Sequence, residues 1–284
     1  MSGGGQPASS AAAERWRALV TARDAQRGAA RRDGDADRDP WRGRADRFAA
    51  YSRQLPADDP LLARLRAAVR PGDTVLDVGA GAGRYALPLA RLARRVVAVE
   101  PSPAMCRALR DGIAAEGVEH VEVVAARWPE AAVAPADVVL CAHVVYGVAA
   151  IVPFLRALDA HARRLCLFAI RVDQHPGLIA LSRALTGAAR TPQPAFAGLY
   201  AVLLELGIVA DVQIVPSGGF GFADHTAAAA HYRDRLGLPA DGPLAARLRD
   251  ELAARLVRDA SGRWRWPGPP PRTAIVSWAP TSDE

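Results

Sequence analysis

A short segment that joins a buried strand to three alternating glycines sets the strongest limit on how this 284-residue chain folds. It reads TVLDVGAGAGR from Thr74 to Arg84 and predicts a strand that turns sharply into a helix. Glycine lets the backbone approach a ligand closely, and the helix N-terminus that follows offers free N–H groups. The next apolar run, Val96–Glu100, ends in a carboxylate. Because an acid at the tip of that strand accepts hydrogen bonds from both ribose hydroxyls, the pattern predicts a cofactor with an unphosphorylated ribose.

Short β-branched runs that alternate with amphipathic stretches continue beyond this unit and predict a parallel sheet with crossover helices. An insert at about residues 217–271 precedes the last strand and contains leucines every fourth residue, as on an amphipathic helix: Leu244, Leu248, Leu252 and Leu256. The expected strands are Thr74–Val78, Val96–Glu100, His120–Val124, Asp137–Ala142, Leu165–Ile170, Val209–Val215 and Thr273–Trp278.

The N-terminal part of the chain divides into two predicted regions. Residues 1–40 are rich in Gly, Ala and Arg and predict a flexible arm, within which a helix around Glu14–Arg27 also fits the composition. Residues 41–70 predict two cap helices that stop at Pro71. Residues 71–284 then form the main domain with its helical insert.

Charge argues against a nucleic-acid partner. The chain has a formal net charge of +6, and all of its basic residues are arginines, because the sequence contains no lysine. Arginines and carboxylates interleave in the first sixty residues, as in Arg31-Arg32-Asp33-Gly34-Asp35, so the long-range field is diluted. A stripe that tracks phosphates is not expected to be diluted in this way.

Cysteine spacing and hydropathy predict a cytoplasmic protein. The three cysteines are far apart, form no C-x-x-C motif and lie in apolar runs, which indicates buried thiols and argues against a zinc site. The N-terminus lacks the charged-then-apolar layout of a signal peptide. The longest apolar stretch, residues 138–152, is interrupted by His143 and is shorter than the roughly 18 to 20 residues that a spanning helix needs, so we expect no membrane contact.

Two cofactors fit the glycine segment and its acid: a nicotinamide dinucleotide and S-adenosylmethionine. The run from Gly81 to Ala86 matches the dinucleotide fingerprint with alanine in third place. Asp77, however, lies inside the strand two residues before the first glycine. Its negative charge there would stabilise a bound ammonium group and not a bound pyrophosphate. The C-terminal part of the chain also has the order helix, strand, long connection and strand. A dinucleotide-binding domain would have a second βαβαβ half there.

Residues 71–170, and more loosely 41–280, resemble a class I S-adenosylmethionine-dependent methyltransferase. Val75–Gly83 resembles the first motif of that family, Glu100–Met105 the second and Asp137–Tyr146 the fourth. The resemblance implies a seven-stranded, mostly parallel Rossmann-like sheet in the order 3-2-1-4-5-7-6, with its last strand antiparallel and helices on both faces. It also implies S-adenosyl-L-methionine as cofactor.

The resemblance assigns roles to individual residues. Gly79 and Gly81 would contact the methionine part, Glu100 the ribose, and Met105 the adenine pocket together with the residues after the third strand. At that last place the family often has an acid and a small residue, whereas this chain has Ala126-Arg127-Trp128. For Asp77 the alternative to a direct or water-bridged cofactor contact is a capping role. For Trp128 the alternative to contact with adenine is core packing. The expected cofactor-binding residues are Asp77, Gly79, Gly81, Gly83, Glu100, Pro101, Met105, Arg127, Trp128 and His143.

The expected catalytic residues are His143 and Tyr146, which follow the fourth strand at the sheet edge where ligands bind. Methyl transfer from a sulfonium is a direct displacement, so alignment supplies most of the rate and a general base is not required. Arg171, Asp173 and His175 follow the fifth strand, where a substrate role and a solvated loop remain alternatives.

Aromatic residues outside the sheet offer candidates for covering the site. Trp41, Phe48 and Tyr51 either close over the cofactor, whose sulfonium favours aromatic faces, or pack between helices. Trp264 and Trp266 form either a lid hairpin or packing over the insert.

Several acceptor classes are excluded by missing motifs. The fourth motif reads Cys141-Ala142-His143-Val144 and the chain has no asparagine, unlike the (Asn/Asp)-Pro-Pro-aromatic motif of adenine or glutamine N-methylation. None of the cysteines follows proline, as cytosine C5 methylation typically requires, and no cluster of oxygens suits a metal. A small-molecule O- or N-methyltransferase remains, with an NAD-linked oxidoreductase and a non-catalytic S-adenosylmethionine-binding protein as alternatives. The sequence leaves the acceptor and the oligomeric state open.

Overall fold

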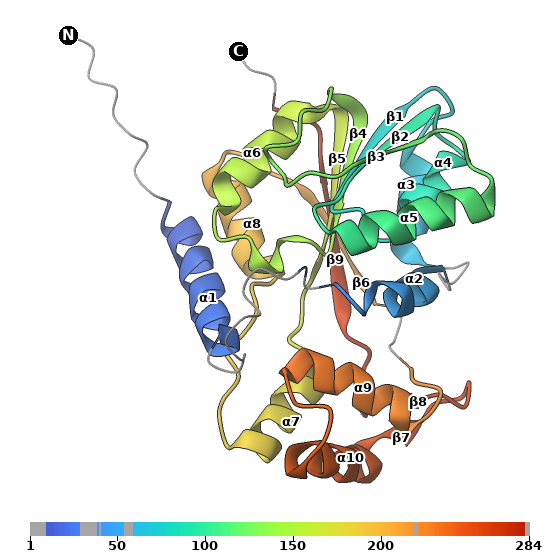
Figure 1. Cartoon of the computed structure of the whole chain (residues 1–284). Helices are drawn as coiled ribbons and strands as arrows, with labels where there is room; N and C mark the ends of the chain where they lie inside the picture. The colour runs from blue at the N-terminus through green and yellow to red at the C-terminus, as the bar shows by residue number, and fades with distance from the viewer. Residues whose placement is uncertain (1–9, 29–38, 40, 54–58, 218–220, 282–284) are drawn as a thin grey trace.

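The computed structural model describes residues 10–28, 39, 41–53, 59–217 and 221–281 (Figure 1). Its centre is a seven-stranded sheet in the order β3-β2-β1-β4-β5-β9-β6, in which β9 runs antiparallel to β5 and β6 and the other neighbours are parallel. With β9 counted as the seventh strand of the sheet, the predicted order is confirmed. The strands are β1 Thr74–Val78, β2 Arg95–Val99, β3 Val121–Val124, β4 Ala136–Ala142, β5 Ala162–Arg171, β6 Asp211–Pro216 and β9 Arg272–Trp278.

Helices cover both faces of the sheet because successive strand residues point to opposite sides. In β4, Val138 and Leu140 pack on one side, while Val139 and Cys141 pack on the other. The first side is covered by α3 Pro60–Ala68, α4 Ala86–Ala90 and α5 Pro103–Glu116, and the second by α1 Ala11–Gly28, α6 Ile151–His161 and α8 Phe196–Glu205.

The N-terminal helix α1 corrects the expectation of a flexible arm over residues 1–40. Trp16 is 1% exposed and its indole N–H donates to the Val148 carbonyl at 2.8 Å. Ala12, Trp16 and Val20 recur every fourth residue, so the helix has an apolar stripe that packs on α8 and α6. The helix allowed around Glu14–Arg27 is therefore present, and the expectation of a flexible arm failed because composition does not show that this stripe meets α8 and α6, which lie far away in the chain. Of the remaining arm, the structure describes only Ser10 and Asp39.

The two expected cap helices are present, but only one of them lies outside the core. α2 Ala45–Arg53 packs on α5, whereas Leu61, Leu62 and Leu65 of α3 are buried against the sheet. The start of α3 is set by Asp59, whose carboxylate accepts the Leu62 N–H at 2.8 Å, and by Pro60 in the first turn.

A separate helical layer lies below the sheet in Figure 1, where β5 leads into α7. It contains the predicted insert: α9 His225–Leu236, α10 Pro243–Arg255 and the short hairpin of β7 Val257–Arg258 and β8 Trp264–Arg265. The connection after β5 joins it through α7 Pro176–Thr186, which the sequence did not associate with the insert. Gly177 permits this packing, because a Cβ there would lie 2.8 Å from the Tyr232 hydroxyl. Among the described residues, no helix combines the length and the apolar character needed to cross a membrane.

Candidate active site at the glycine loop

The turn between β1 and α4 has the left-handed backbone that its glycines predict. Gly79, Gly81 and Gly83 have φ angles of 76°, 56° and 87°. A Cβ at Gly79 would collide with Val144, whereas a Cβ at Gly81 would meet, within 4 Å among the described residues, only Phe48 Cε1 at 3.8 Å. Gly81 is therefore the point of the turn at which a ligand has room to approach the backbone.

Glu100 faces this turn from the end of β2. Its side chain is buried, with Oε2 accepting the Gly81 N–H at 2.9 Å and Oε1 accepting the Ser102 N–H at 2.8 Å. Burial raises the pKa of this carboxyl, and the two amides oppose that shift. A carboxylate has about four acceptor positions, so two remain for further donors such as ribose hydroxyls.

Asp77 lies under the same turn and is 2% exposed. Burial, followed by repulsion from Glu100, raises its pKa from 3.8 to about 7, although the Ala86 backbone N–H donates to it. The structure thus shows the capping contact at the start of α4 that the sequence allowed as an alternative. A buried carboxylate with a strongly raised pKa is also characteristic of functional sites, because a cationic ligand offsets its cost.

Asp39 and α2 cover the glycine turn. The Asp39 carboxylate accepts the Ser102 hydroxyl at 2.8 Å and the Ala104 N–H at 3.0 Å, which fastens this segment to the start of α5. Trp41 and Phe48, whose ring centroids are 4.9 Å apart, then pack on a patch around Met105. Met105 shares this patch with Ala82 of the turn, and its place in an adenine pocket stays a prediction. Sequence reasoning missed Asp39, whose partners lie more than sixty residues away in the chain.

His143 follows β4 directly and has a φ of 60°, the one positive φ at a non-glycine residue among those described. Such strain concentrates at functional sites. Its Nδ1 lies 2.9 Å from the Tyr146 hydroxyl, which also accepts the Arg171 backbone N–H at 3.0 Å. Desolvation, then Arg171, Arg84 and Arg235, lowers the pKa of His143, although its side chain is exposed, so the imidazole is neutral at neutral pH.

The structure thus brings the ends of β1, β2, β4 and β5 together around a turn, a buried acid and a neutral histidine. Residues 75–165 match a family model described as a methyltransferase domain. This stretch is therefore similar to a methyltransferase domain, and the sheet has the strand order that the resemblance to class I S-adenosylmethionine-dependent methyltransferases implied.

Solved structures with the same fold have distant sequences. A putative methyltransferase from Bacillus halodurans matches with a TM-score of 0.57 at 14% identity, covering 80% of this chain and 100% of that chain. The YcgJ protein from Bacillus subtilis matches with a TM-score of 0.54 at 14% identity, covering 78% of this chain and 98% of that chain. At this identity the likeness shows the fold alone.

Curated relatives resemble short stretches of the chain. A protein-L-isoaspartate O-methyltransferase from Methylorubrum extorquens is 45% identical over 76 residues, which are 26% of this chain and 32% of that protein. A probable ribosomal RNA small subunit methyltransferase A from Methanosarcina acetivorans is 44% identical over 59 residues, or 21% of each chain. The chain thus spans less than a third of the length of either relative.

Four further residues that the sequence singled out for the cofactor or the substrate have the following surroundings. Trp128 donates its indole N–H to the Phe154 carbonyl of α6 at 3.2 Å and meets the His161 ring edge-on, so its described contacts are the packing alternative. Arg127 and Pro101 are exposed. Asp173 forms an ion pair with Arg272 at 2.8 Å, a contact within the scaffold.

Two of the aromatic residues that were candidates for covering the site pack elsewhere, and the side chain of a third is not described. Trp264, in β8, and Trp266 pack over the insert helices, which is the second of the two predicted roles. The Tyr51 side chain lies outside the described part of the structure.

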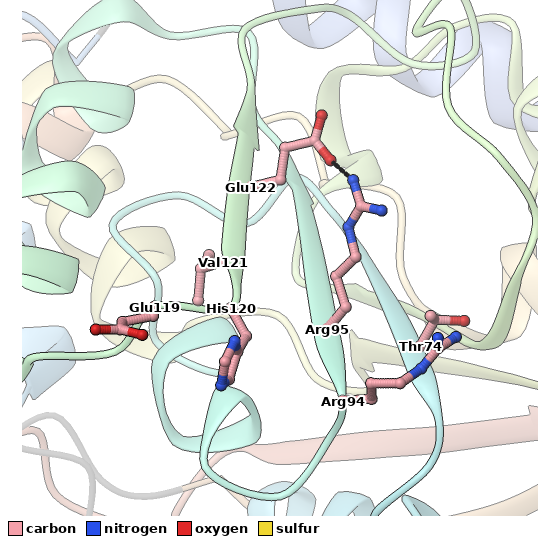
Figure 2. A pocket seen from close by; sticks show the side chains of 7 residues that line it. All are labelled: Thr74, Arg94, Arg95, Glu119, His120, Val121 and Glu122. Carbon is pink, nitrogen blue, oxygen red and sulfur yellow. Dashed lines mark hydrogen bonds and ion pairs between the residues drawn. The ribbon is translucent and has the colours of Figure 1, made fainter.

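A surface pocket of about 370 Å³ lies at the opposite edge of the sheet, where β1, β2 and β3 begin (Figure 2). Arg95 and Glu122 form an ion pair across it. Because ligands of open α/β sheets bind at the other edge, we assign this pocket no catalytic role.

Proposed function

We propose that the chain is an S-adenosylmethionine-dependent methyltransferase that transfers a methyl group directly to an oxygen or nitrogen of a small-molecule acceptor. The Glu100 carboxylate carries the proposal, because the amides of Gly81 and Ser102 hold it against the glycine turn with acceptor positions left over. That arrangement suits a ribose with two free hydroxyls.

When bound, S-adenosylmethionine supplies an electrophilic methyl group on a positively charged sulfur. The residues of this chain would then bind and orient it: Glu100 would accept the ribose hydroxyls, ionised Asp77 would attract the ammonium group, and Gly81 would hold the methionine part. Trp41 and Phe48, which pack on the patch beside the turn, would limit the access of water to it. Alignment of this kind supplies on the order of 7–11 kcal/mol of the barrier reduction.

His143 and Tyr146 are proposed to face the acceptor. A neutral imidazole can take or share the acceptor proton, and the Tyr146 hydroxyl fixes the ring through Nδ1. Proton transfer by such a group adds about 10²–10⁴-fold, which is a smaller contribution than alignment.

A small-molecule acceptor is supported by the layer of α7, α9 and α10, which covers the edge of the sheet where the site lies. The relatives named above are described as acting on isoaspartyl protein or ribosomal RNA, so protein and RNA acceptors remain alternatives. The short shared stretches fit a common cofactor site better than a common acceptor site.

Calorimetry tests the proposal directly. The full chain is expected to bind S-adenosylhomocysteine and not NADH, and Glu100→Ala should weaken that binding by about 1–3 kcal/mol because charge-assisted hydrogen bonds are lost. Glu122→Ala, at the opposite edge of the sheet, is the matched control and should bind normally. Binding of NADH alone would support the oxidoreductase alternative, and tight cofactor binding without turnover on broad acceptor panels the non-catalytic one.

A further inference from the structure

Several backbone donors of the glycine turn are already used within the protein. Four N–H groups between β1 and α4 donate to oxygens of β2, of Glu100 or of the turn itself, and they belong to Gly79, Ala80, Gly81 and Gly83. Each of these N–H groups is one donor, so it is not available to a ligand while that bond is made. A carboxylate that lies at these glycines therefore finds few donors in the turn, and a side chain from another element is needed to supply one.

Ser52 of α2 has a buried hydroxyl without a partner. The residue is 2% exposed, and its Oγ has no hydrogen-bond partner among the described residues. A serine inside a helix usually faces water or bonds back to the carbonyl four residues earlier. A buried hydroxyl that does neither costs stability, and a functional role is one explanation for keeping it.

The Ser52 side chain lies on the face of α2 that meets the glycine turn. Ser52 follows Ala49 by three positions and Phe48 by four, and residues at these spacings are neighbours on one helix face. Ala49 is 2% exposed and belongs to the patch that includes Ala82 of the turn. Phe48 Cε1 lies 3.8 Å from the point that a Cβ at Gly81 would occupy. A ligand that approaches the Gly81 backbone therefore lies next to this face of α2.

Contacts on two sides hold α2 in this orientation. Asp39, before the helix, accepts the Ser102 hydroxyl and the Ala104 N–H at the start of α5. Arg47 forms an ion pair with Asp234 of α9, and Figure 1 shows α2 between α5 and α9. None of these contacts uses Ser52, so its hydroxyl is held in place and remains available to a ligand.

We propose that the Ser52 hydroxyl donates a hydrogen bond to the carboxylate of the methionine part of bound S-adenosylmethionine. This inference rests on the proposed function and adds to its cofactor site a residue from the helix that covers the turn. Charge separates the two ends of the amino-acid group, since buried Asp77 suits the ammonium and repels the carboxylate. A hydroxyl that donates to a carboxylate forms a short, charge-assisted bond.

Calorimetry with two ligands tests this assignment. The full chain and Ser52→Ala are titrated with S-adenosylhomocysteine and with its decarboxylated analogue, which keeps the ammonium, the sulfur and the nucleoside. Ser52→Ala should weaken S-adenosylhomocysteine by about tenfold or more and the analogue by less than about twofold, because only the first ligand has the carboxylate. Equal losses for the two ligands, or no loss for S-adenosylhomocysteine, would overturn the inference.

The melting temperature of the ligand-free protein separates a ligand contact from a structural role. Ser52→Ala removes an unpaired buried hydroxyl and puts a better helix former into α2, so its melting temperature should equal or exceed that of the wild type. A lower melting temperature would show that the hydroxyl has a partner inside the protein, and the inference would fail.

Ala50→Ser is the matched control, because it adds a hydroxyl to the exposed face of the same helix. It should leave the affinity for both ligands unchanged. If Ala50→Ser weakens S-adenosylhomocysteine as much as Ser52→Ala does, the effect comes from α2 as a whole and the role of Ser52 is refuted.

The two proposals fail in different ways. A wild-type chain that does not bind S-adenosylhomocysteine refutes the proposed function and, with it, the ligand assigned to Ser52. Wild-type binding that Ser52→Ala leaves unchanged refutes the role of Ser52 and leaves the proposed function standing.

Discussion

Replacing Asp77 by asparagine should make the protein more stable above neutral pH and a weaker binder of its cofactor. The carboxyl is 2% exposed and its pKa is raised from 3.8 to about 7 by burial and by Glu100. Between these two values the native state binds more protons than the unfolded state, so the free energy of unfolding falls as the pH rises through that window. Asparagine keeps an oxygen for the Ala86 N–H and never ionises.

The size of the effect follows from the pKa shift. At 1.36 kcal/mol per unit, ionising Asp77 costs the wild-type protein about 2 kcal/mol more at about pH 8 than at about pH 5.5. The stability advantage of Asp77→Asn should grow by that amount over the same range, since Glu100 is present in both proteins.

Urea unfolding of both proteins at several pH values measures this difference, and equal slopes against urea would confirm that the two unfolded states are comparable. Calorimetry on the same samples should show weaker binding of S-adenosylhomocysteine by Asp77→Asn at pH 8. Parallel stability curves for the two proteins across this range would refute the assigned burial of charge at Asp77.

Three further predictions concern Asp77, the contact between Tyr146 and His143, and the packing of Trp16. Wild-type affinity for S-adenosylhomocysteine should fall as the pH drops below about 7, because the ammonium group favours ionised Asp77; a pH-independent calorimetric affinity would contradict this. Tyr146→Phe should lower kcat more than cofactor affinity, because it releases His143 Nδ1; equal losses in kcat and in affinity would contradict this. Trp16→Ala should cost about 3–5 kcal/mol in urea unfolding, whereas Arg17→Ala on the exposed face of α1 should change stability by less than about 0.5 kcal/mol.

The glycine turn and Glu100 were predictable because their geometry is local. A strand, a turn that needs positive φ and a helix start are all specified by neighbouring residues, and parallel pairing of β1 with β2 brings the carboxylate to the turn. The strand order was also predicted, although it came from the family resemblance and not from periodicity alone. Trp128 shows where sequence reasoning stops. A ring after the third strand can line an adenine pocket or pack in the core, and the described contacts of Trp128 are with α6.

Local patterning in this chain therefore specifies the alternating sheet, the glycine turn and the buried acid beside it. Folding in three dimensions decides what surrounds that turn. Asp39 accepts a hydrogen bond from Ser102, α7 packs on the insert helices, and Arg23 donates to the Tyr146 carbonyl, all through contacts between segments far apart in the chain. No neighbouring residue encodes such contacts, because they depend on which helix faces remain to be buried once the sheet has formed.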